Sequence, residues 1–251
     1  MSWYEGRHAV VTGGGTGIGA ATASVLRDKG AAVTITGRNR DRLAAKAGEL
    51  GAGFQVADVT DRLQVSQAID AAERASGPVD ILVNNAGAAE AAPFTRTSDE
   101  LWDSMLAINL TGVFNCTKAV ASGMLERGSG SIVNVASTAA LAGYAYVAAY
   151  CAAKHGVLGL TRALALEFAA RGVTVNAVCP GYTNTDLVTQ TIDKIVASTG
   201  RTREEALAEL VKSNPQGRLV EPEEVADTII WLCRQRSMNG QAVAVAGGEV
   251  M

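Results

Sequence analysis

The sequence contains no long hydrophobic run, and no stretch approaches the roughly 18 apolar residues that a membrane-spanning helix needs. The first residues, Met1-Ser-Trp-Tyr-Glu-Gly-Arg-His8, also lack the cationic end and apolar core of a secretory signal. These two absences predict a protein that stays in the cytoplasm and makes no membrane contact.

Cysteine is scarce and its spacing is irregular. The four cysteines lie far apart and form no CxxC motif: Cys116, Cys151, Cys179 and Cys233. This spacing argues against a zinc site and against a dense disulfide framework. We therefore expect reduced, mostly structural cysteines and no bound metal.

Blocks of like charge are also missing. Charged residues make up 19% of the chain, the net charge is −3, and the lysines and arginines are scattered. The sequence thus offers no basic patch for nucleic acid or for an anionic membrane. Apolar residues make up 48%, enough for a sizeable core, so the expected partner is a small, soluble molecule.

Short β-branched runs alternate with longer helical patterns along the whole chain. The runs predict strands at His8–Thr12, Ala32–Thr36, Phe54–Ala57, Ile81–Asn84, Ser131–Ala136, Val173–Val178 and Ala242–Val245. Helical periodicity covers Gly19–Lys29, Arg62–Ala75, Asp99–Glu126, Ala149–Ala170 and Glu223–Arg234. Near-continuous apolar strands separated by helices predict a seven-stranded parallel sheet with helices on both faces.

No Pro- or Ser-rich linker, low-complexity run or internal repeat divides the chain. The simplest prediction is therefore one Rossmann-type, doubly wound α/β domain over residues 1–251. Residues 185–217 interrupt the regular alternation, and Gly200 separates two helical patterns there. This helical hairpin is predicted either to form a lid over a site or to be a surface feature without a gating role.

A glycine-rich motif, Thr12-Gly-Gly-Gly-Thr-Gly-Ile-Gly19, follows the first strand and opens a helix. Glycines let the backbone turn tightly and approach a pyrophosphate, and free amides at the helix start favour negative charge. The strand-turn-helix context predicts a dinucleotide site. Its expected contacts are Gly13, Gly15, Thr16, Gly17, Ile18 and Gly19.

The second strand is followed by Gly37-Arg38-Asn39, without the carboxylate that commonly binds an adenosine ribose. The Arg38 guanidinium can pair with a 2′-phosphate, so the sequence favours NADP(H) over NAD(H), although Arg38 can also be an ordinary surface charge. Asp58 and Val59, just beyond the third strand, are predicted to lie near the adenine. Asp58-Val-Thr-Asp61 can equally cap the next helix.

Asn84-Asn-Ala-Gly87 ends the fourth strand at the edge where such sheets bind ligands. Asn85, Ala86 and Gly87 are expected to contact the cofactor. Asparagine side chains can also tie neighbouring strands together, and for Asn84 this structural role is an equal alternative.

Tyr150 and Lys154 lie four residues apart at the start of a predicted helix, so both side chains share one face. A lysine cation favours the phenolate, which makes the tyrosine a candidate general acid/base. Ser137 ends the preceding strand and can converge with Tyr150 on one carbonyl oxygen. Asn109 can reach the same edge and hold a water against Lys154.

These motifs together resemble the short-chain dehydrogenase/reductase family over essentially the whole chain. The resemblance implies that Tyr150 is the general acid/base, that Ser137 polarises the carbonyl and that Asn109 maintains a proton relay. It also implies that Lys154 binds the nicotinamide ribose and lowers the pKa of Tyr150. Pro180, Gly181, Thr183 and Thr185 would form the loop at the nicotinamide. NADP-preferring members often carry a basic residue where this chain has Thr16.

Within the family, the chain looks most like reductases of 3-oxoacyl thioesters and polyketide intermediates, carried by coenzyme A or by a carrier protein. The expected reaction interconverts a ketone and a secondary alcohol. Ser137, Tyr144, Tyr150 and Tyr182 are the expected substrate contacts, and Leu141 and Tyr146 can also line the pocket. A cyclic alcohol, diol or sugar is the alternative substrate, and a non-catalytic dinucleotide sensor is the remaining alternative.

Family members are commonly homotetramers packed through the helices predicted at Asp99–Glu126 and Ala149–Ala170.

Overall fold

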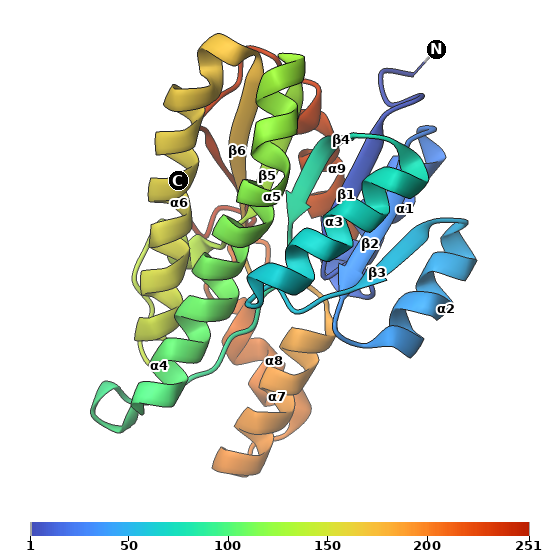
Figure 1. Cartoon of the computed structure of the whole chain (residues 1–251). Helices are drawn as coiled ribbons and strands as arrows, with labels where there is room; N and C mark the ends of the chain where they lie inside the picture. The colour runs from blue at the N-terminus through green and yellow to red at the C-terminus, as the bar shows by residue number, and fades with distance from the viewer. Residues whose placement is uncertain (1, 251) are drawn as a thin grey trace.

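A single parallel sheet forms the centre of the computed structural model, which describes residues 2–250 (Figure 1). Its strand order is β3-β2-β1-β4-β5-β6-β7. The strands are β1 (His8–Thr12), β2 (Ala32–Gly37), β3 (Gly53–Val56), β4 (Val79–Asn84), β5 (Gly130–Val135), β6 (Val173–Pro180) and β7 (Ala242–Val245). The predicted seven-stranded, parallel, doubly wound sheet is therefore confirmed.

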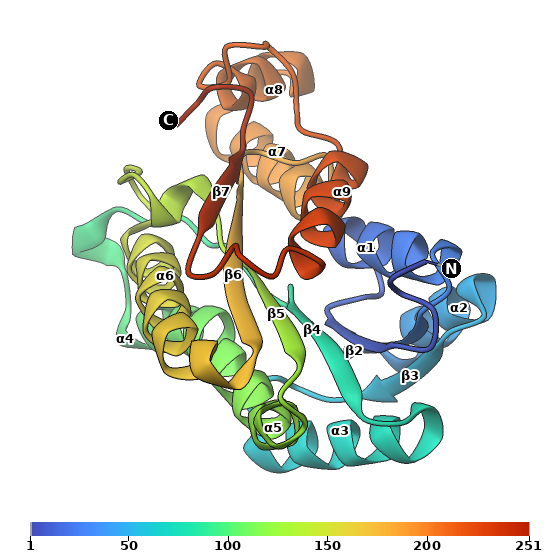
Figure 2. The same ribbon diagram turned by 90° about the horizontal axis from the view of Figure 1, so that it is seen from above.

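Helices cover both faces of the sheet (Figure 2). One face is covered by α1 (Gly17–Asp28), α2 (Arg40–Leu50) and α9 (Pro222–Cys233), and the other by α3 (Arg62–Ser76), α5 (Gly112–Arg127) and α6 (Ala148–Phe168). Successive residues of a strand point to opposite faces of the sheet. Val10 therefore packs with α3, α5 and α6, and Val11 packs with α1, α2 and α9. Both are fully buried, which explains why the central strands have few polar residues.

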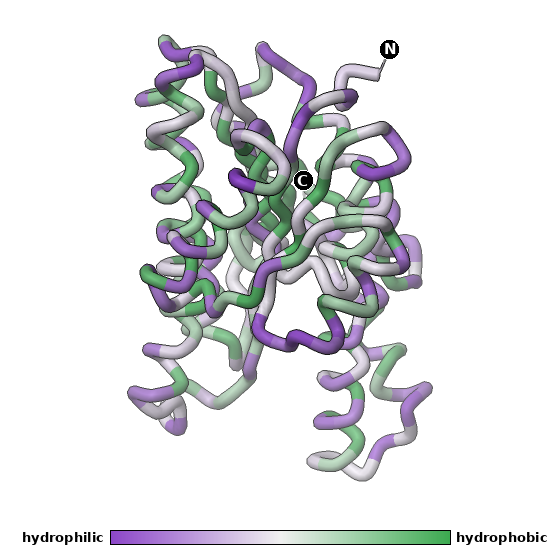
Figure 3. The backbone as a smooth tube through the Cα atoms, turned by 45° about the vertical axis from the view of Figure 1, so that its right-hand side comes forward, coloured by the Kyte–Doolittle hydropathy of each residue, from purple (hydrophilic) through white to green (hydrophobic). Residues whose placement is uncertain are grey.

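Hydropathy follows this layering. In Figure 3 hydrophobic residues are concentrated in the centre of the molecule, whereas hydrophilic residues are frequent on the outer helices and loops. No helix within residues 2–250 is long and apolar enough to cross a membrane. The four cysteines carry no disulfide.

The predicted element boundaries agree with the structure to within a few residues. No helix is predicted for residues 40–50, where the structure has α2. This helix is rich in charged residues, and Leu43 and Ala47 are its only buried positions, so its apolar stripe is short.

The helix predicted at Asp99–Glu126 is wrong as a single regular helix. The structure has α4 (Asp99–Leu106), a π-helical segment at Ala107–Thr111, and then α5. The side-chain Nδ2 of Asn109 donates to the Met105 carbonyl at 3.0 Å, the group that the Asn109 amide would use in an α-helix. This substitution is consistent with the widened turn, a feature frequent at functional sites.

The predicted hairpin is present as α7 (Asp186–Thr199) and α8 (Arg203–Val211), separated at Gly200. Gly200 adopts a left-handed backbone (φ 71°), which glycine tolerates without a steric penalty. Val188, Ile192, Ala206 and Leu210 form a small core of their own between the two helices. Figure 1 shows the pair extending beyond the sheet, next to the carboxyl ends of the strands.

A chain of buried polar side chains joins β4, β5 and the helices over them. Asn84 Nδ2 donates to Asn134 Oδ1 at 2.9 Å and to Thr117 Oγ1 at 3.0 Å. Asn134 Nδ2 in turn donates to Thr161 Oγ1 at 2.9 Å. The predicted cross-strand role of Asn84 is thereby confirmed.

Replacing Asn134 by leucine should destabilise the fold, because it leaves the buried Asn84 amide without one acceptor. A buried polar group that loses its partner costs about 1–3 kcal/mol, so the urea midpoint should fall. Gln67→Leu is the matched control, since it removes an exposed amide on α3 and should change stability by no more than about 0.5 kcal/mol. Equal midpoints for the two variants would contradict the role assigned to the chain of buried amides.

Candidate active site

The predicted site residues all lie at or near the carboxyl edge of the sheet. Gly13, Gly15, Thr16, Gly17, Ile18 and Gly19 span the turn from β1 into α1, Arg38 follows β2, Asp58 and Val59 follow β3, and Asn85, Ala86 and Gly87 follow β4. Ser137 follows β5, and Asn109 lies in the π-helical segment. Tyr144 precedes α6, and Tyr150 and Lys154 lie in the first two turns of that helix. The residues that end or follow β6 are Pro180, Gly181, Tyr182, Thr183 and Thr185. Parallel strands produce this clustering because all of them end at the same edge.

The glycine-rich turn leaves no room for side chains at three positions. Gly13 and Gly17 have positive φ angles of 65° and 53°. A Cβ on Gly13 would lie 2.9 Å from Asn85 Nδ2, and one on Gly17 would lie 3.0 Å from Thr185 Cγ2. A Cβ on Gly19 would collide with the carbonyl oxygen of Gly13. Glycine is thus required at these positions because the backbone packs closely against Asn85, Thr185 and itself.

The amino end of α1 is left without a side-chain cap. Thr16 occupies the N-cap position but makes no side-chain hydrogen bond to the helix, and the first turn contains no acidic residue. In contrast, Asn39 caps α2 and Asp61 caps α3 through their side-chain oxygens. Free amides and the positive end of the helix dipole suit a phosphate group, so these residues fit a dinucleotide pyrophosphate.

Thr12 and Asn85 fix this turn to β4. Thr12 Oγ1 accepts hydrogen bonds from the amides of Asn85 and Ala86, both at 3.0 Å. Asn85 Nδ2 donates to the carbonyls of Thr12 and Gly13 at 3.0 and 3.1 Å. The side chain predicted to contact the cofactor is therefore also a structural brace. The brace role of Thr12 was missed, because an ordinary strand threonine carries no sequence signal for it.

Two arginines lie at the predicted adenosine side of the site. Arg38 NH1 lies 4.0 Å from Asp58 Oδ2, and the Arg38 side chain is 72% exposed, so this ion pair is weak and leaves the guanidinium accessible. Arg42 was missed by the sequence analysis, although its aliphatic atoms lie 3.5–3.6 Å from the Cβ position of Gly15. The sequence carries no signal for it, because Arg38 precedes the N-cap Asn39 and therefore shares no helix face with Arg42.

Asp58 and Val59 differ in their surroundings. Asp58 Oδ1 accepts from the amide and the hydroxyl of Thr60 at 2.9 and 2.8 Å, while the cap of α3 is Asp61. The predicted capping of the next helix by Asp58-Val-Thr-Asp61 is therefore confirmed, and Asp61 is the capping residue. Val59 is buried, and its carbonyl accepts from Asn115 Nδ2 at 2.9 Å.

Tyr150, Ser137 and Lys154 converge from β5 and α6. Burial raises the pKa of Tyr150 to about 12, and a contact with the Ser137 side chain acts in the opposite direction. The expected lowering of the Tyr150 pKa by Lys154 is therefore not seen in this structure: burial dominates, and the phenol keeps its proton at neutral pH, as a proton donor must. Lys154 Nζ lies 5.6 Å from the centre of the Tyr150 ring and donates to the Val135 carbonyl at 2.9 Å. Burial lowers the pKa of Lys154 to about 8.

Asn109 and Lys154 meet beside Gly87. A Cβ on Gly87 would lie 2.9 Å from Asn109 Oδ1 and 3.7 Å from Lys154 Nζ, so only glycine leaves this space open. Asn109 Nδ2 donates to the carbonyls of Ala88 and Met105, at 2.8 and 3.0 Å. Both amide hydrogens are thus engaged, which orients Oδ1 as an acceptor.

The loop after β6 closes the other side. The Gly181 amide donates to the Val245 carbonyl at 3.1 Å, and Thr183 Oγ1 donates back to the Gly181 carbonyl at 3.0 Å. Thr185 begins α7 and packs its methyl group against Gly17. The loop therefore brings the predicted nicotinamide contacts next to the glycine-rich turn.

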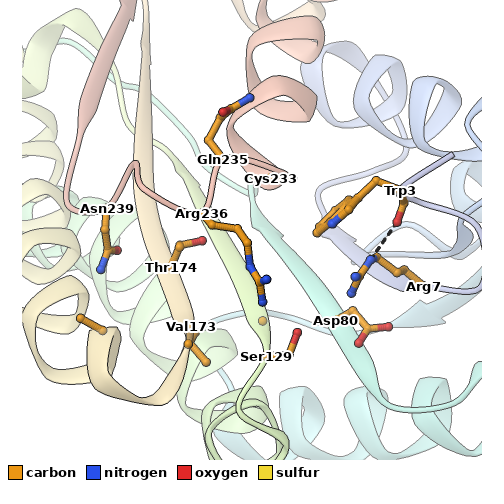
Figure 4. Close-up of a pocket in the computed structure, with 13 residues that line it drawn as sticks. Trp3, Arg7, Asp80, Ser129, Val173, Thr174, Cys233, Gln235, Arg236 and Asn239 are labelled. Carbon is orange, nitrogen blue, oxygen red and sulfur yellow. Dashed lines mark hydrogen bonds between the residues drawn. The ribbon is translucent and has the colours of Figure 1, made fainter.

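Two cavities lie outside the Tyr150 site. One of about 470 Å³ opens at the amino ends of the strands, where Arg7, Asp80 and Arg236 surround it (Figure 4). Because β4 and β6 begin at this edge, the cavity lies opposite the candidate active site. A second cavity of about 430 Å³ borders Gly17 and Thr185, beside the glycine-rich turn.

Comparisons with known proteins agree with this geometry. A family model described as short chain dehydrogenase matches residues 7–196. The chain is 40% identical to an acetoacetyl-CoA reductase of Rhizobium meliloti, covering 97% of this chain and 98% of the relative. It is also 40% identical to a D-threitol dehydrogenase of Mycolicibacterium smegmatis, covering 97% of this chain and 93% of the relative.

Among solved structures, a tryptophan-substituted variant of actinorhodin polyketide ketoreductase with NADPH has a TM-score of 0.94 at 38% identity, with 99% of each chain covered. The match therefore extends over the whole sheet and the helical hairpin. The chain belongs to the short-chain dehydrogenase/reductase family.

Proposed function

We propose that this protein is an NADP(H)-preferring reductase that interconverts a 3-oxoacyl thioester and the corresponding 3-hydroxyacyl thioester. The observation that carries the proposal is the convergence of Ser137, Tyr150, Lys154 and Asn109 next to a glycine turn fit for a pyrophosphate. The acetoacetyl-CoA reductase and the polyketide ketoreductase among its relatives support the substrate class.

A bound nicotinamide cofactor would supply hydride to the carbonyl carbon or accept it from the alcohol. Tyr150 gives its phenol proton to the forming alkoxide, and burial keeps that proton in place until it is needed. Ser137 Oγ already accepts the Ala139 amide at 3.1 Å, so its hydrogen remains available to the carbonyl oxygen. These two donors polarise the carbonyl and complete the protonation.

Lys154 and Asn109 resupply the proton. Lys154 Nζ uses one of its three hydrogens on the Val135 carbonyl and retains two for the ribose and for a water. Asn109 Oδ1 faces the space left open by Gly87 and can hold such a water as an acceptor. The relay thus runs from a water through Lys154 to Tyr150.

The preference for NADP(H), with NAD(H) also usable, rests on Arg38. Its guanidinium is exposed and only weakly paired. Arg42 lies near the same turn, but its NH1 is 3.8 Å from Asp186 Oδ2, so that carboxylate offsets its charge. The NADPH in the related ketoreductase structure supports this assignment. Asp58 and Val59 remain predicted adenine neighbours.

A diol or sugar alcohol is the second candidate substrate, because one relative at 40% identity is a D-threitol dehydrogenase. Both candidates share the same hydride and proton chemistry. They differ in the neighbours of the carbonyl, so a substrate panel separates them.

We also propose a domain organisation, a cellular location and an assembly for this chain. Residues 1–251 act as one domain in the cytoplasm, and the hairpin at 185–217 serves as a lid over the substrate. The chain assembles as a homotetramer through α5 and α6, an arrangement that would cover Phe114 and Leu166, which are 39% and 83% exposed in the single chain.

Tyr150→Phe should abolish turnover while the cofactor still binds. Loss of general acid/base catalysis alone costs roughly 10²–10⁴ in rate. The measurement is NADPH oxidation at 340 nm with acetoacetyl-CoA, with cofactor affinity followed by NADPH fluorescence. Near-normal turnover by the variant would refute the role of Tyr150, and tight cofactor binding without turnover of any carbonyl by the unmodified protein would favour a dinucleotide sensor.

Arg38→Ala should reduce the preference for NADPH over NADH by roughly 10- to 100-fold, because one charge-assisted contact to the 2′-phosphate contributes about 1.5–3 kcal/mol. The measurement is kcat/KM for each cofactor at saturating acetoacetyl-CoA. Arg40→Ala is the matched control, since it removes an exposed guanidinium that lies over the Phe54 ring instead. Equal preferences in Arg38→Ala and the unmodified protein would overturn the assignment.

A further inference from the structure

The carboxylate of Glu249 lies beside Tyr144, one of the predicted substrate contacts, although it follows the last strand of the sheet. Its Oε1 accepts a hydrogen bond from the Tyr144 hydroxyl at 2.6 Å. Its Oε2 is buried, and no hydrogen-bond donor reaches it within residues 2–250. A Cβ on Gly181 would lie 2.7 Å from that oxygen, so glycine at 181 makes room for the carboxylate.

The segment that carries Glu249 is held in a defined turn. Gly247 and Gly248 have φ angles of 60° and 96°, and the Glu249 amide donates to the Ala246 carbonyl at 3.1 Å. A Cβ on Gly247 would collide with the Asn214 side chain, just after α8. In Figure 2 the chain accordingly leaves β7 and runs past α8. The turn therefore fixes Glu249 against the base of the hairpin.

The charge of Glu249 acts on the two tyrosines predicted to contact the substrate. Burial, followed by the hydrogen bond to Glu249, raises the pKa of Tyr144 to about 12. Burial is also the main cause that raises the pKa of Tyr182, and the Glu249 charge adds to it. Tyr182 in turn contributes to the raised pKa of Tyr150. The negative charge of Glu249 therefore lies close to both of these tyrosines.

The hydrogen bond also fixes what Tyr144 can offer to a substrate. Its single hydrogen is donated to Glu249, so toward the pocket its oxygen can only accept. A substrate carboxylate beside this pair would meet the negative charge of Glu249. A neutral ester or thioester avoids that repulsion.

We propose that Glu249, acting with Tyr144, is a specificity-determining residue that excludes free 3-oxo acids and admits their neutral esters and thioesters. This inference rests on the proposed function, because it concerns the carbonyl compound that Tyr150 protonates. Glu249 excludes the anion by its charge, and Tyr144 holds the carboxylate in place.

The test compares ethyl acetoacetate with acetoacetate, which differ in the charge next to the same 3-oxo group. With NADPH, the unmodified protein should show a kcat/KM ratio that strongly favours the ester. Glu249→Gln keeps an oxygen acceptor for Tyr144 but removes the charge, and should reduce that ratio at least tenfold, mainly through a gain with the acid. Tyr144→Phe keeps the charge and should still favour the ester.

Glu126→Gln is the matched control, because it removes an exposed carboxylate at the end of α5 and should leave the ratio unchanged. If both compounds are reduced but Glu249→Gln retains the ratio of the unmodified protein within twofold, the inference fails and the proposed function stands. If NADPH binds but neither 3-oxo compound nor acetoacetyl-CoA is reduced, the proposed function fails, and the inference fails with it.

Discussion

The common direction of the strands is the constraint on which the site depends. Seven parallel strands end at one edge, and the order reverses between β1 and β4, so the connections that follow these strands lead to opposite faces. The divergence leaves the glycine-rich turn accessible. Thr12 and Asn85 join the two strands there through hydrogen bonds between side chains and backbone. A ligand at this edge therefore meets a backbone surface that is already fixed.

The polar groups of the site are held mainly by backbone carbonyls. Lys154 donates to Val135, and Asn109 donates to Ala88 and Met105, so each is buried with a partner. A buried polar group without a partner is costly, and these bonds offset that cost while they fix the direction of the remaining donors and acceptors. The π-helical turn at Asn109 belongs to the same arrangement. There the Met105 carbonyl accepts the side chain of Asn109 within the irregular part of the helix.

The predicted pyrophosphate and adenosine contacts and the predicted substrate contacts come from different parts of the chain. The glycine-rich turn and the predicted adenosine contacts come from the first third of the sequence, whereas the predicted substrate contacts Tyr144 and Tyr182 and the proposed specificity residue Glu249 come from its second half. Glu249 stands 105 residues after Tyr144, yet the two share a hydrogen bond. The substrate side is thus assembled by long-range contacts, and this arrangement allows the cofactor chemistry to be kept while the pocket varies.

The sequence by itself determined the fold class, the glycine-rich turn and the pairing of Tyr150 with Lys154, because these depend on local periodicity and on short, fixed spacings. Ser137 and the cross-strand role of Asn84 also followed, since residues at the ends of parallel strands must meet at one edge. The interruption at Asn109 did not follow, because periodicity in an apolar helix cannot show that a side chain takes the place of a backbone donor. Arg42 and Glu249 became visible only in the tertiary structure. Each is an ordinary charged residue in the sequence, and its meaning comes from neighbours that folding brings to it from distant parts of the chain.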